Sequence, residues 1–197
     1  MINRCIYLIK KYSFFSLIIV LILDGLSPKQ AFAFKPGLSL SYGTGKPDQL
    51  AGYRIALQSF WPFVGFAHSP VNLTGYWDMS FASWKVNPTQ SNQPSAIHIL
   101  AASPVIRLQT REKFIFGAQP YLELGIGASV LSHNHLGHRD LGGKFAFQDL
   151  IGLGLRWGTL HTWSLSYHYL HYSNAGLFPP NQGIDVKHLV SLGYEFN

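Results

Sequence analysis

The chain has 197 residues, with 15 Lys and Arg, 9 Asp and Glu, 9 His, a single Cys and 15% aromatic residues. A chain of this length is expected to form one domain. Four of the basic residues and one acidic residue fall within the first 33 positions, which leaves 11 Lys and Arg against 8 Asp and Glu. This small excess gives no argument for a nucleic-acid partner, and none is expected.

The first 33 residues have the pattern of a cleavable signal peptide. Basic residues precede an apolar run over 14–23, and Ala31-Phe32-Ala33 supplies a cleavage site with small residues at both ends. A membrane anchor is the alternative, but the run is roughly half of the ~20 residues that a spanning helix needs. We therefore expect a signal peptide over 1–33 and one domain over 34–197. Cys5 lies in the signal, so the mature domain cannot rely on disulfides.

The remaining chain alternates between apolar residues and small or polar ones, in segments broken by Pro, Asn and Gly. It has no run of about 18 apolar residues, which excludes helical membrane spans. The alternation predicts eight strands, over residues 37–44, 50–61, 71–84, 95–108, 118–132, 143–157, 161–173 and 185–196.

One face of several predicted strands is apolar and the other is small or polar. The apolar face of the last strand would carry Val186, Val190 and Leu192. On the opposite face, Glu123 and Arg156 would point inward from neighbouring strands and could pair with each other. The alternation suits either a soluble sandwich with an apolar core or a membrane barrel with its apolar face toward lipid.

Strand length and aromatic placement favour the barrel. The predicted strands approach or exceed the ~9–11 residues that cross a bilayer at a tilt. Aromatic residues gather at strand ends as interfacial girdles do, at Trp61, Trp84, Trp157, Trp163 and Tyr194. The predicted fold class is all-β, an eight-stranded antiparallel transmembrane β-barrel of the outer membrane. Side chains fill the bore of such a barrel, so we do not expect a porin.

If the mature N-terminus starts in the periplasm, the connections over 132–142 and 174–184 lie on the cell exterior, and the turn over 158–160 is periplasmic. The first of these loops holds His133, His135 and His138 with Asp140. Such a group could bind a divalent metal, but the surrounding Asn and Gly favour a polar loop, so we expect no metal and no cofactor. Charges near strand ends are expected to be solvated or paired with lipid phosphates: Lys85, Arg107, Arg139 and Lys144.

His171 and Ser173 stand two residues apart at the end of a predicted strand, so they share one face. Counting back along that face gives Tyr169, Tyr167 and Leu165, a surface suited to lipid. A serine hydroxyl becomes a nucleophile when a neighbouring base takes its proton and an acid orients that base. His171 is therefore a candidate base and Ser173 a candidate nucleophile, although the H-x-S spacing alone is common at wet strand ends.

The residues that follow supply candidates for the remaining roles. Asn174 offers a side-chain amide and Gly176 an unhindered N–H to a developing oxyanion. Asp185, which opens the last strand, is the candidate acid, and Asp149 is the other nearby carboxylate. Residue parity points Asp149 toward lipid and Asp185 inward, away from His171. A twist or bulge at the start of the last strand is therefore expected.

The string His171-Tyr172-Ser173-Asn174-Ala175-Gly176, followed by Asn181 and Gly183-Ile184-Asp185, resembles the signature of the PagL-type lipid A 3-O-deacylases. The likeness extends more weakly through 120–125 and 147–154. It implies an eight-stranded outer-membrane barrel that hydrolyses the acyl ester at position 3 of lipid A in lipopolysaccharide, among the outer-leaflet lipids and without a cofactor.

By this resemblance His171 is the base, Ser173 the nucleophile, and Asn174 and Gly176 the oxyanion donors. Asn181 and Asp149 are candidates for supporting roles. Asp185 stands where the family has Glu, and it is shorter by one bond, about 1.5 Å. The resemblance leaves open whether the protein forms a homodimer.

Two other functions compete with the esterase. A noncatalytic small barrel, acting as an adhesin or a membrane stabiliser, would make the H-x-S pair incidental. A lipid A acyltransferase would also place serine and histidine near the leaflet, but it would need a pocket for the acyl donor inside the barrel.

Overall fold

The computed structural model describes residues 35–45, 49–62, 64–66, 68–87, 93–158 and 162–196. The predicted signal peptide over 1–33 lies outside these residues, so it stays a prediction. Within them, no helix has the length and apolar character needed to cross a bilayer.

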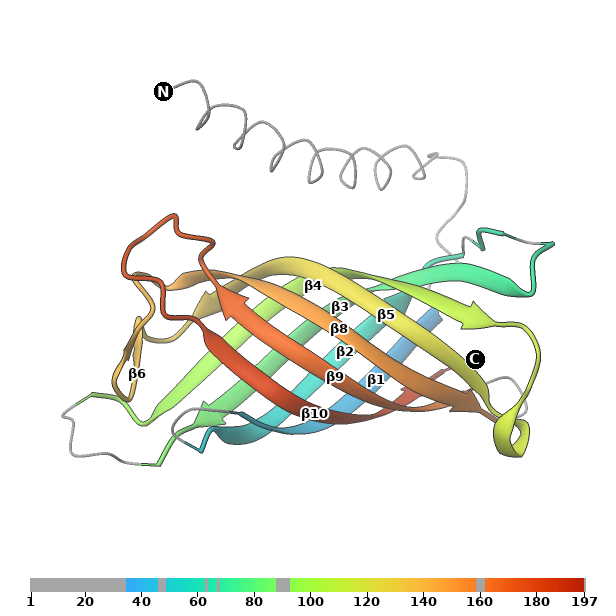
Figure 1. The fold of residues 1–197 in the computed structure, drawn as a ribbon, viewed down its shortest axis with the longest axis horizontal. Coiled ribbons are helices and arrows are strands. Elements are labelled where there is room, and N and C mark those ends of the chain that lie inside the picture. Colours follow the sequence, from blue (N-terminus) through green and yellow to red (C-terminus); the bar gives the residue numbers. More distant parts are fainter. Residues whose placement is uncertain are drawn as a thin grey trace, which may run out of the picture. The chain divides into compact units, whose positions relative to one another are not determined.

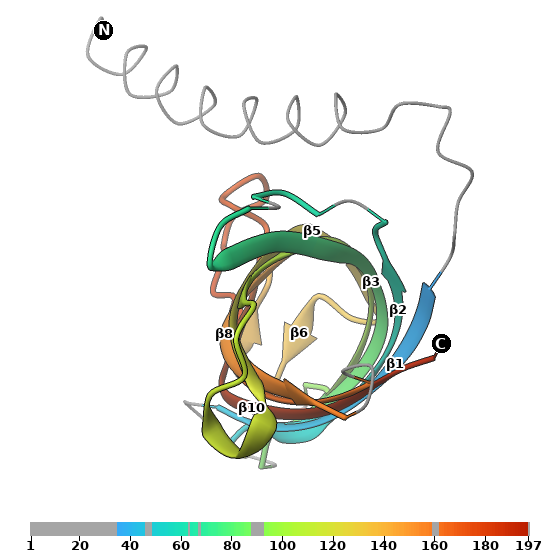
Figure 2. The same ribbon diagram turned by 90° about the vertical axis from the view of Figure 1, so that its right-hand side faces the viewer.

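The strands form a closed barrel in which each strand pairs antiparallel with two neighbours, in the order β1-β10-β9-β8-β5-β4-β3-β2 (Figures 1 and 2). The strands of the barrel are β1 Lys35–Thr44, β2 Ala51–Phe60, β3 Val71–Lys85, β4 Ala96–Thr110, β5 Gln119–Leu131, β8 Phe145–Trp157, β9 Trp163–Ser173 and β10 Ile184–Glu195. Every predicted strand is present, with ends that differ by at most two residues. The prediction of an eight-stranded barrel is confirmed, and the sandwich alternative is wrong.

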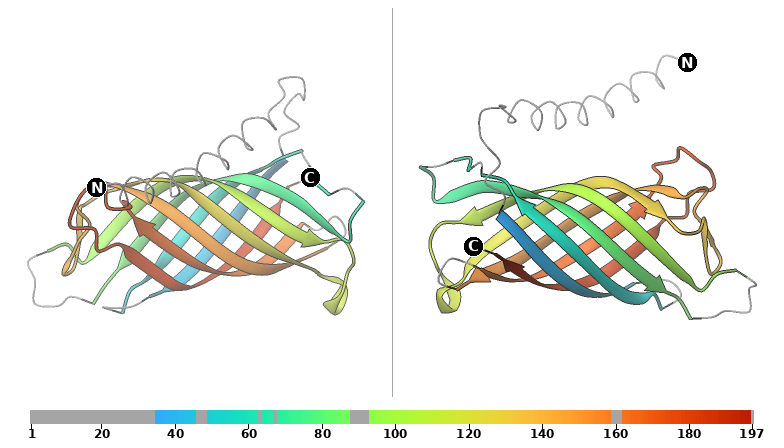
Figure 3. Two further views of the ribbon diagram at one scale, coloured as in Figure 1. Left: turned by 45° about the horizontal axis from the view of Figure 1, so that its top comes forward. Right: turned by 180° about the vertical axis from the view of Figure 1, so that it is seen from behind.

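Three short elements were not predicted. The two-residue strands β6 His135–Leu136 and β7 Arg139–Asp140 pair with each other within the connection between β5 and β8. A 3₁₀ turn, η1 Ile115–Gly117, lies between β4 and β5. The β6–β7 hairpin and the β9–β10 connection lie at the same end of the barrel (Figure 3). The last residues of β10 lie at the opposite end.

The outer surface of the barrel is apolar because alternate residues of each strand point away from the interior. On β5, for example, Leu122, Leu124 and Val130 are exposed while their chain neighbours Tyr121, Glu123 and Ser129 are buried. Closing the sheet pairs the backbone N–H and C=O groups of both strand edges, as a lipid environment requires.

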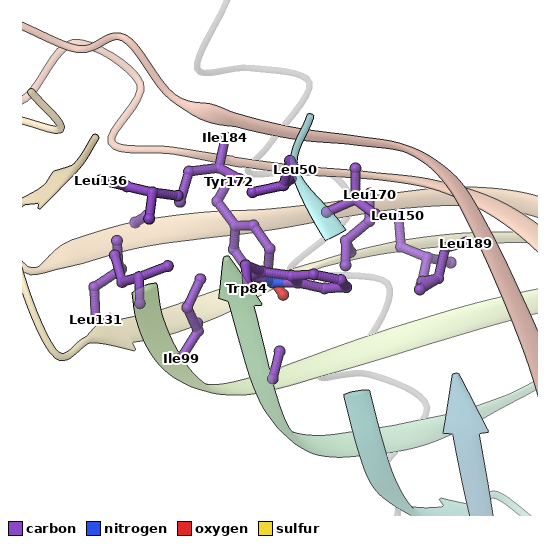
Figure 4. Packing of buried hydrophobic residues seen from close by; sticks show 14 of the residues in the cluster. Leu50, Trp84, Ile99, Leu131, Leu136, Leu150, Leu170, Tyr172, Ile184 and Leu189 are labelled. Atoms are coloured by element: carbon purple, nitrogen blue, oxygen red, sulfur yellow. The ribbon is translucent and has the colours of Figure 1, made fainter. Parts of the chain in front are cut away.

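An apolar cluster fills the interior near the β9–β10 connection (Figure 4). Trp84, predicted as an interfacial residue, is fully buried there, and Leu136 from the β6–β7 hairpin packs into the same cluster. The prediction for Trp84 is wrong because its position on β3 faces the interior. Val186, predicted to face lipid, is also fully buried in this cluster.

The interior further along the barrel is polar and built from ion pairs. Glu123 accepts a hydrogen bond of 2.7 Å from Arg107 Nε and lies 2.9 Å from His168 Nε2, and all three side chains are buried. The predicted partner of Glu123, Arg156, instead pairs with Glu195. Arg107 was predicted as a solvated charge, which is wrong because its inward position on β4 aligns with Glu123 across the β4–β5 ladder.

We expect Glu123→Ala and Arg107→Ala each to destabilise the barrel by about 3–5 kcal/mol, because each change leaves a buried charge without its partner. The double variant should cost less than the sum of the two single changes. Urea unfolding in lipid vesicles, followed by tryptophan fluorescence, measures all three. Strictly additive costs would contradict the pairing.

Candidate active site

The candidate residues lie on the outer surface of the barrel, in a row across three adjacent strands. His171 on β9 is the register partner of Asp149 on β8 and of Asp185 on β10. Ser173 follows at the end of β9, on the same face as His171. Their neighbours Leu170, Tyr172 and Ile184 point inward and are buried in the apolar cluster. The site therefore sits directly over a packed interior.

A β-bulge brings the acid to the base. The register between β9 and β10 shifts by one residue between Val186 and Leu189, and Lys187 and His188 within the shift are both exposed. The extra residue reverses the parity of the first residues of β10, so that Asp185 points outward while Val186 points inward. The expected bulge is confirmed, and it accounts for the misplaced Val186.

His171 and Asp185 form a hydrogen-bonded pair, with 2.8 Å between His171 Nδ1 and Asp185 Oδ1. Because a carboxylate accepts hydrogen bonds, this contact keeps a proton on Nδ1 and leaves Nε2 as the basic nitrogen. The pair is partly exposed, with relative side-chain accessibilities of 30% and 27%. The Asp185 side chain, one bond shorter than that of Glu, thus reaches His171 because the two residues are direct register partners.

Asp149 borders the same imidazole from β8. It is half-buried, and its carboxylate makes no hydrogen bond with any residue in the described part of the chain. Ser173 Oγ likewise has no hydrogen-bond partner there, so no described residue holds its hydroxyl.

Gly183 keeps space open beside the candidate base and nucleophile. Its φ of +62° is in the left-handed region, and a Cβ there would lie 3.2 Å from His171 Cε1 and 3.7 Å from Ser173 Cβ. It would also lie 3.0 Å from the carbonyl oxygen of Tyr172. A side chain at position 183 would therefore both strain the backbone and crowd the imidazole.

The Asn174 side chain makes hydrogen bonds that hold the β9–β10 connection in its conformation. It is buried, and its Nδ2 donates to the carbonyl oxygens of Leu141 at 2.8 Å and Phe178 at 2.7 Å. Its Oδ1 accepts the Gly176 N–H at 2.8 Å. These contacts use both amide hydrogens and the Gly176 donor, so neither residue offers the free oxyanion donor that was expected of it in this arrangement.

Asn181 makes a different contact in the same connection. Its Oδ1 accepts the backbone N–H of Asn174, the residue after Ser173, at 3.1 Å. The residue is exposed, and its Nδ2 donates to no described residue. Asn181 therefore has an available amide donor near the serine.

The β6–β7 hairpin also contacts this connection through hydrogen bonds. Arg139 Nη1 donates to the carbonyl oxygen of Gly183 at 2.6 Å, and the backbone N–H of Asp140 donates to Gln182 Oε1 at 2.7 Å. Arg139 was predicted as a solvated or phosphate-paired charge, and it instead anchors the glycine beside His171. The sequence did not reveal this contact between Arg139 and Gly183, because it depends on a hairpin too short to show alternation.

The histidines of this hairpin region do not assemble a metal site. Across the ranges described, no group of three or more His, Cys, Asp or Glu side chains could hold a metal ion. His135 Nε2 lies 3.6 Å from Asp140 Oδ2, which is an ion-pair distance only if the imidazole is protonated.

Comparisons with known proteins agree with this architecture. A family model described as "Lipid A 3-O-deacylase (PagL)" matches residues 49–195. The lipid A deacylase PagL of Pseudomonas aeruginosa is 33% identical over 133 residues, which cover 68% of this chain and 72% of that protein. The lipid A deacylase PagL of Bordetella bronchiseptica is 30% identical over 168 residues, covering 85% and 87%.

A solved structure is similar as well. The crystal structure of the outer membrane enzyme PagL superposes with a TM-score of 0.70 at 30% sequence identity, over 80% of this chain and 98% of that one.

We expect Gly183→Ala to slow labelling of Ser173 by a serine-directed fluorophosphonate, by on the order of a hundredfold if the imidazole moves by ~1 Å. Gly117→Ala is the matched control, because Gly117 also has positive φ but a Cβ there meets nothing within 4 Å. Gel fluorescence of the labelled, detergent-folded protein compares the two. Equal labelling of both variants would show that position 183 does not shape the site.

Proposed function

Because the chain belongs to the lipid A 3-O-deacylase (PagL) family, we propose that it is a serine esterase of the outer membrane that hydrolyses the 3-O-linked acyl ester of lipid A. In this proposal Ser173 is the nucleophile, His171 the general base and Asp185 the acid that orients it. The hydrogen bond between His171 and Asp185, with Ser173 two residues along on the same outward face, is the observation that carries the proposal.

The reaction proceeds through an acyl-enzyme. Ser173 Oγ attacks the ester carbonyl carbon while His171 Nε2 accepts its proton, and Asp185 stabilises the imidazolium that forms. The tetrahedral intermediate collapses, the sugar oxygen leaves with the proton from His171, and Ser173 keeps the acyl group. Water, activated by the same imidazole, then attacks the acyl-enzyme and releases the fatty acid and the free serine.

The developing oxyanion needs a donor that the free protein does not already use. We assign this role to Asn181 Nδ2, because its Oδ1 is tied to the N–H of the residue after Ser173 while its own N–H groups stay available among the described residues. Asn174 then acts by shaping the connection, and Gly176 by allowing the turn that lets its N–H reach Asn174.

The lipid-facing position of the site suits an acyl ester held in a membrane leaflet. Tyr167, Leu165 and Trp163 continue the same face of β9 and are exposed. With the β9–β10 connection on the cell exterior, His171 and Ser173 lie at the outer edge of the bilayer, where the ester bonds of lipid A meet the hydrocarbon layer.

The small size of the interior cavity is evidence against a lipid A acyltransferase. The cavity bordered by Arg54, Asp78, Arg107 and Glu123 has a volume of ≈ 10 Å³, which is room for about one water molecule. An acyl-donor chain would require these buried ion pairs to separate. A noncatalytic barrel is the remaining alternative, and it differs from the esterase in the reactivity of Ser173.

Ser173→Ala and His171→Asn should abolish deacylation, because the first removes the nucleophile and the second its base. Mass spectra of lipid A from cells that express each variant should lack the species that has lost one 3-linked hydroxyacyl chain. Heat-modifiable migration on gels checks that each variant is folded. Persistence of the lighter lipid A in cells with either folded variant would refute the serine mechanism.

The two carboxylates that flank His171 should differ in effect. Asp185→Asn should lower kcat by up to about 10⁴-fold, as loss of the orienting carboxylate does in serine hydrolases. Asp149→Asn, the matched change on the opposite neighbouring strand, should leave kcat close to that of the unmodified protein because Asp149 makes no hydrogen bond to the imidazole. Steady-state deacylation in detergent micelles measures both, and the reverse order would reassign the acid to Asp149.

A further inference from the structure

Tyr169 contacts the candidate acid directly. It lies two residues before His171 on β9 and faces the same way. Its hydroxyl donates to Asp185 Oδ1 at 2.5 Å, the same oxygen that lies 2.8 Å from His171 Nδ1. The Tyr169 and His171 rings are nearly parallel, with an interplanar angle of 8° and centroids 6.4 Å apart. One carboxylate oxygen thus joins two side chains of the neighbouring strand.

The position of Asp185 makes a second hydrogen bond to its carboxylate important. It is the second residue of β10, between the β9–β10 connection and the bulge, and its side chain is partly exposed on the lipid-facing surface. Hydrogen bonds to an ionised carboxylate are stronger than those between neutral groups. A carboxylate held only by His171 could rotate about its side-chain bonds and lose the imidazole, whereas a second donor on the same oxygen restrains that rotation.

We propose that Tyr169 is a positioning residue for the esterase, whose hydroxyl holds Asp185 in the conformation that orients His171. This inference rests on the proposed function, because it assigns Asp185 to the catalytic triad. Tyr169 acts through Asp185 and takes no proton from the substrate.

The chain offers a matched control two residues away. Tyr167 also lies on the outer face of β9, and its hydroxyl makes a hydrogen bond of the same 2.5 Å length, but to His188 Nδ1. His188 is exposed within the bulge and contacts neither His171 nor Asp185 through a hydrogen bond. Tyr169→Phe and Tyr167→Phe therefore remove the same group from similar surroundings, and only the first touches the acid.

The experiment compares these variants as full-length barrels folded in detergent micelles, with lipid A as substrate. Tyr169→Phe should lower kcat by about 10- to 100-fold, in line with loss of a hydrogen bond to a charged group. Its KM should change little, and Tyr167→Phe should keep both constants. A kcat for Tyr169→Phe equal to that of the unmodified protein, or an equal loss in Tyr167→Phe, would overturn the inference.

A double-variant cycle separates positioning from a general structural effect. In an Asp185→Asn background, Tyr169→Phe should cause little further loss, because the group it positions is already gone. If the two losses multiply, Tyr169 does not act through Asp185 and the inference falls. If a Ser173→Ala barrel were still active, the proposed serine esterase itself would be refuted. Failure of the proposed function can therefore be told apart from failure of the inference about Tyr169.

Discussion

The placement of the site depends on one extra residue in the ladder between β9 and β10. In a closed sheet every residue has a fixed side, since alternate side chains point to opposite faces. A regular β10 with Leu189 inward would also turn Asp185 inward, on the opposite side of the sheet from His171. The bulge between Val186 and Leu189 reverses the first residues of the strand alone, so Asp185 faces outward while the rest of β10 keeps its pattern.

The interior supports this outward-facing site in two ways. Near the β9–β10 connection, Leu170, Tyr172 and Ile184 alternate with the candidate site residues and are buried in the apolar cluster. A close-packed interior resists small displacements, which limits movement of the strand ends that carry the reacting groups. Further along, buried ion pairs such as that of Arg107 with Glu123 fill the bore and connect neighbouring strands.

The sequence predicted the strands closely because alternation and turn residues are local signals. The candidate base and acid named from the sequence, His171 and Asp185, form a hydrogen bond in the fold, while the catalytic roles of these residues and of Ser173 stay predictions. Prediction from the sequence failed where the answer depended on neighbouring strands: parity shows that Glu123 faces inward, but only the register selects Arg107 over Arg156 as its partner. The contacts of Asn174 could not be predicted from the sequence for a related reason, because the folded connection turns its amide toward Leu141 and Phe178.

The candidate reacting groups are on the outside of a barrel whose bore is filled. A substrate therefore approaches by lateral diffusion within the leaflet and never passes through a lumen. Its effective concentration is a mole fraction among neighbouring lipids rather than an amount per volume of solvent. Turnover should consequently respond to surface dilution, so that inert lipid or detergent added at constant bulk substrate slows the reaction. The permeability of the membrane should not change with turnover.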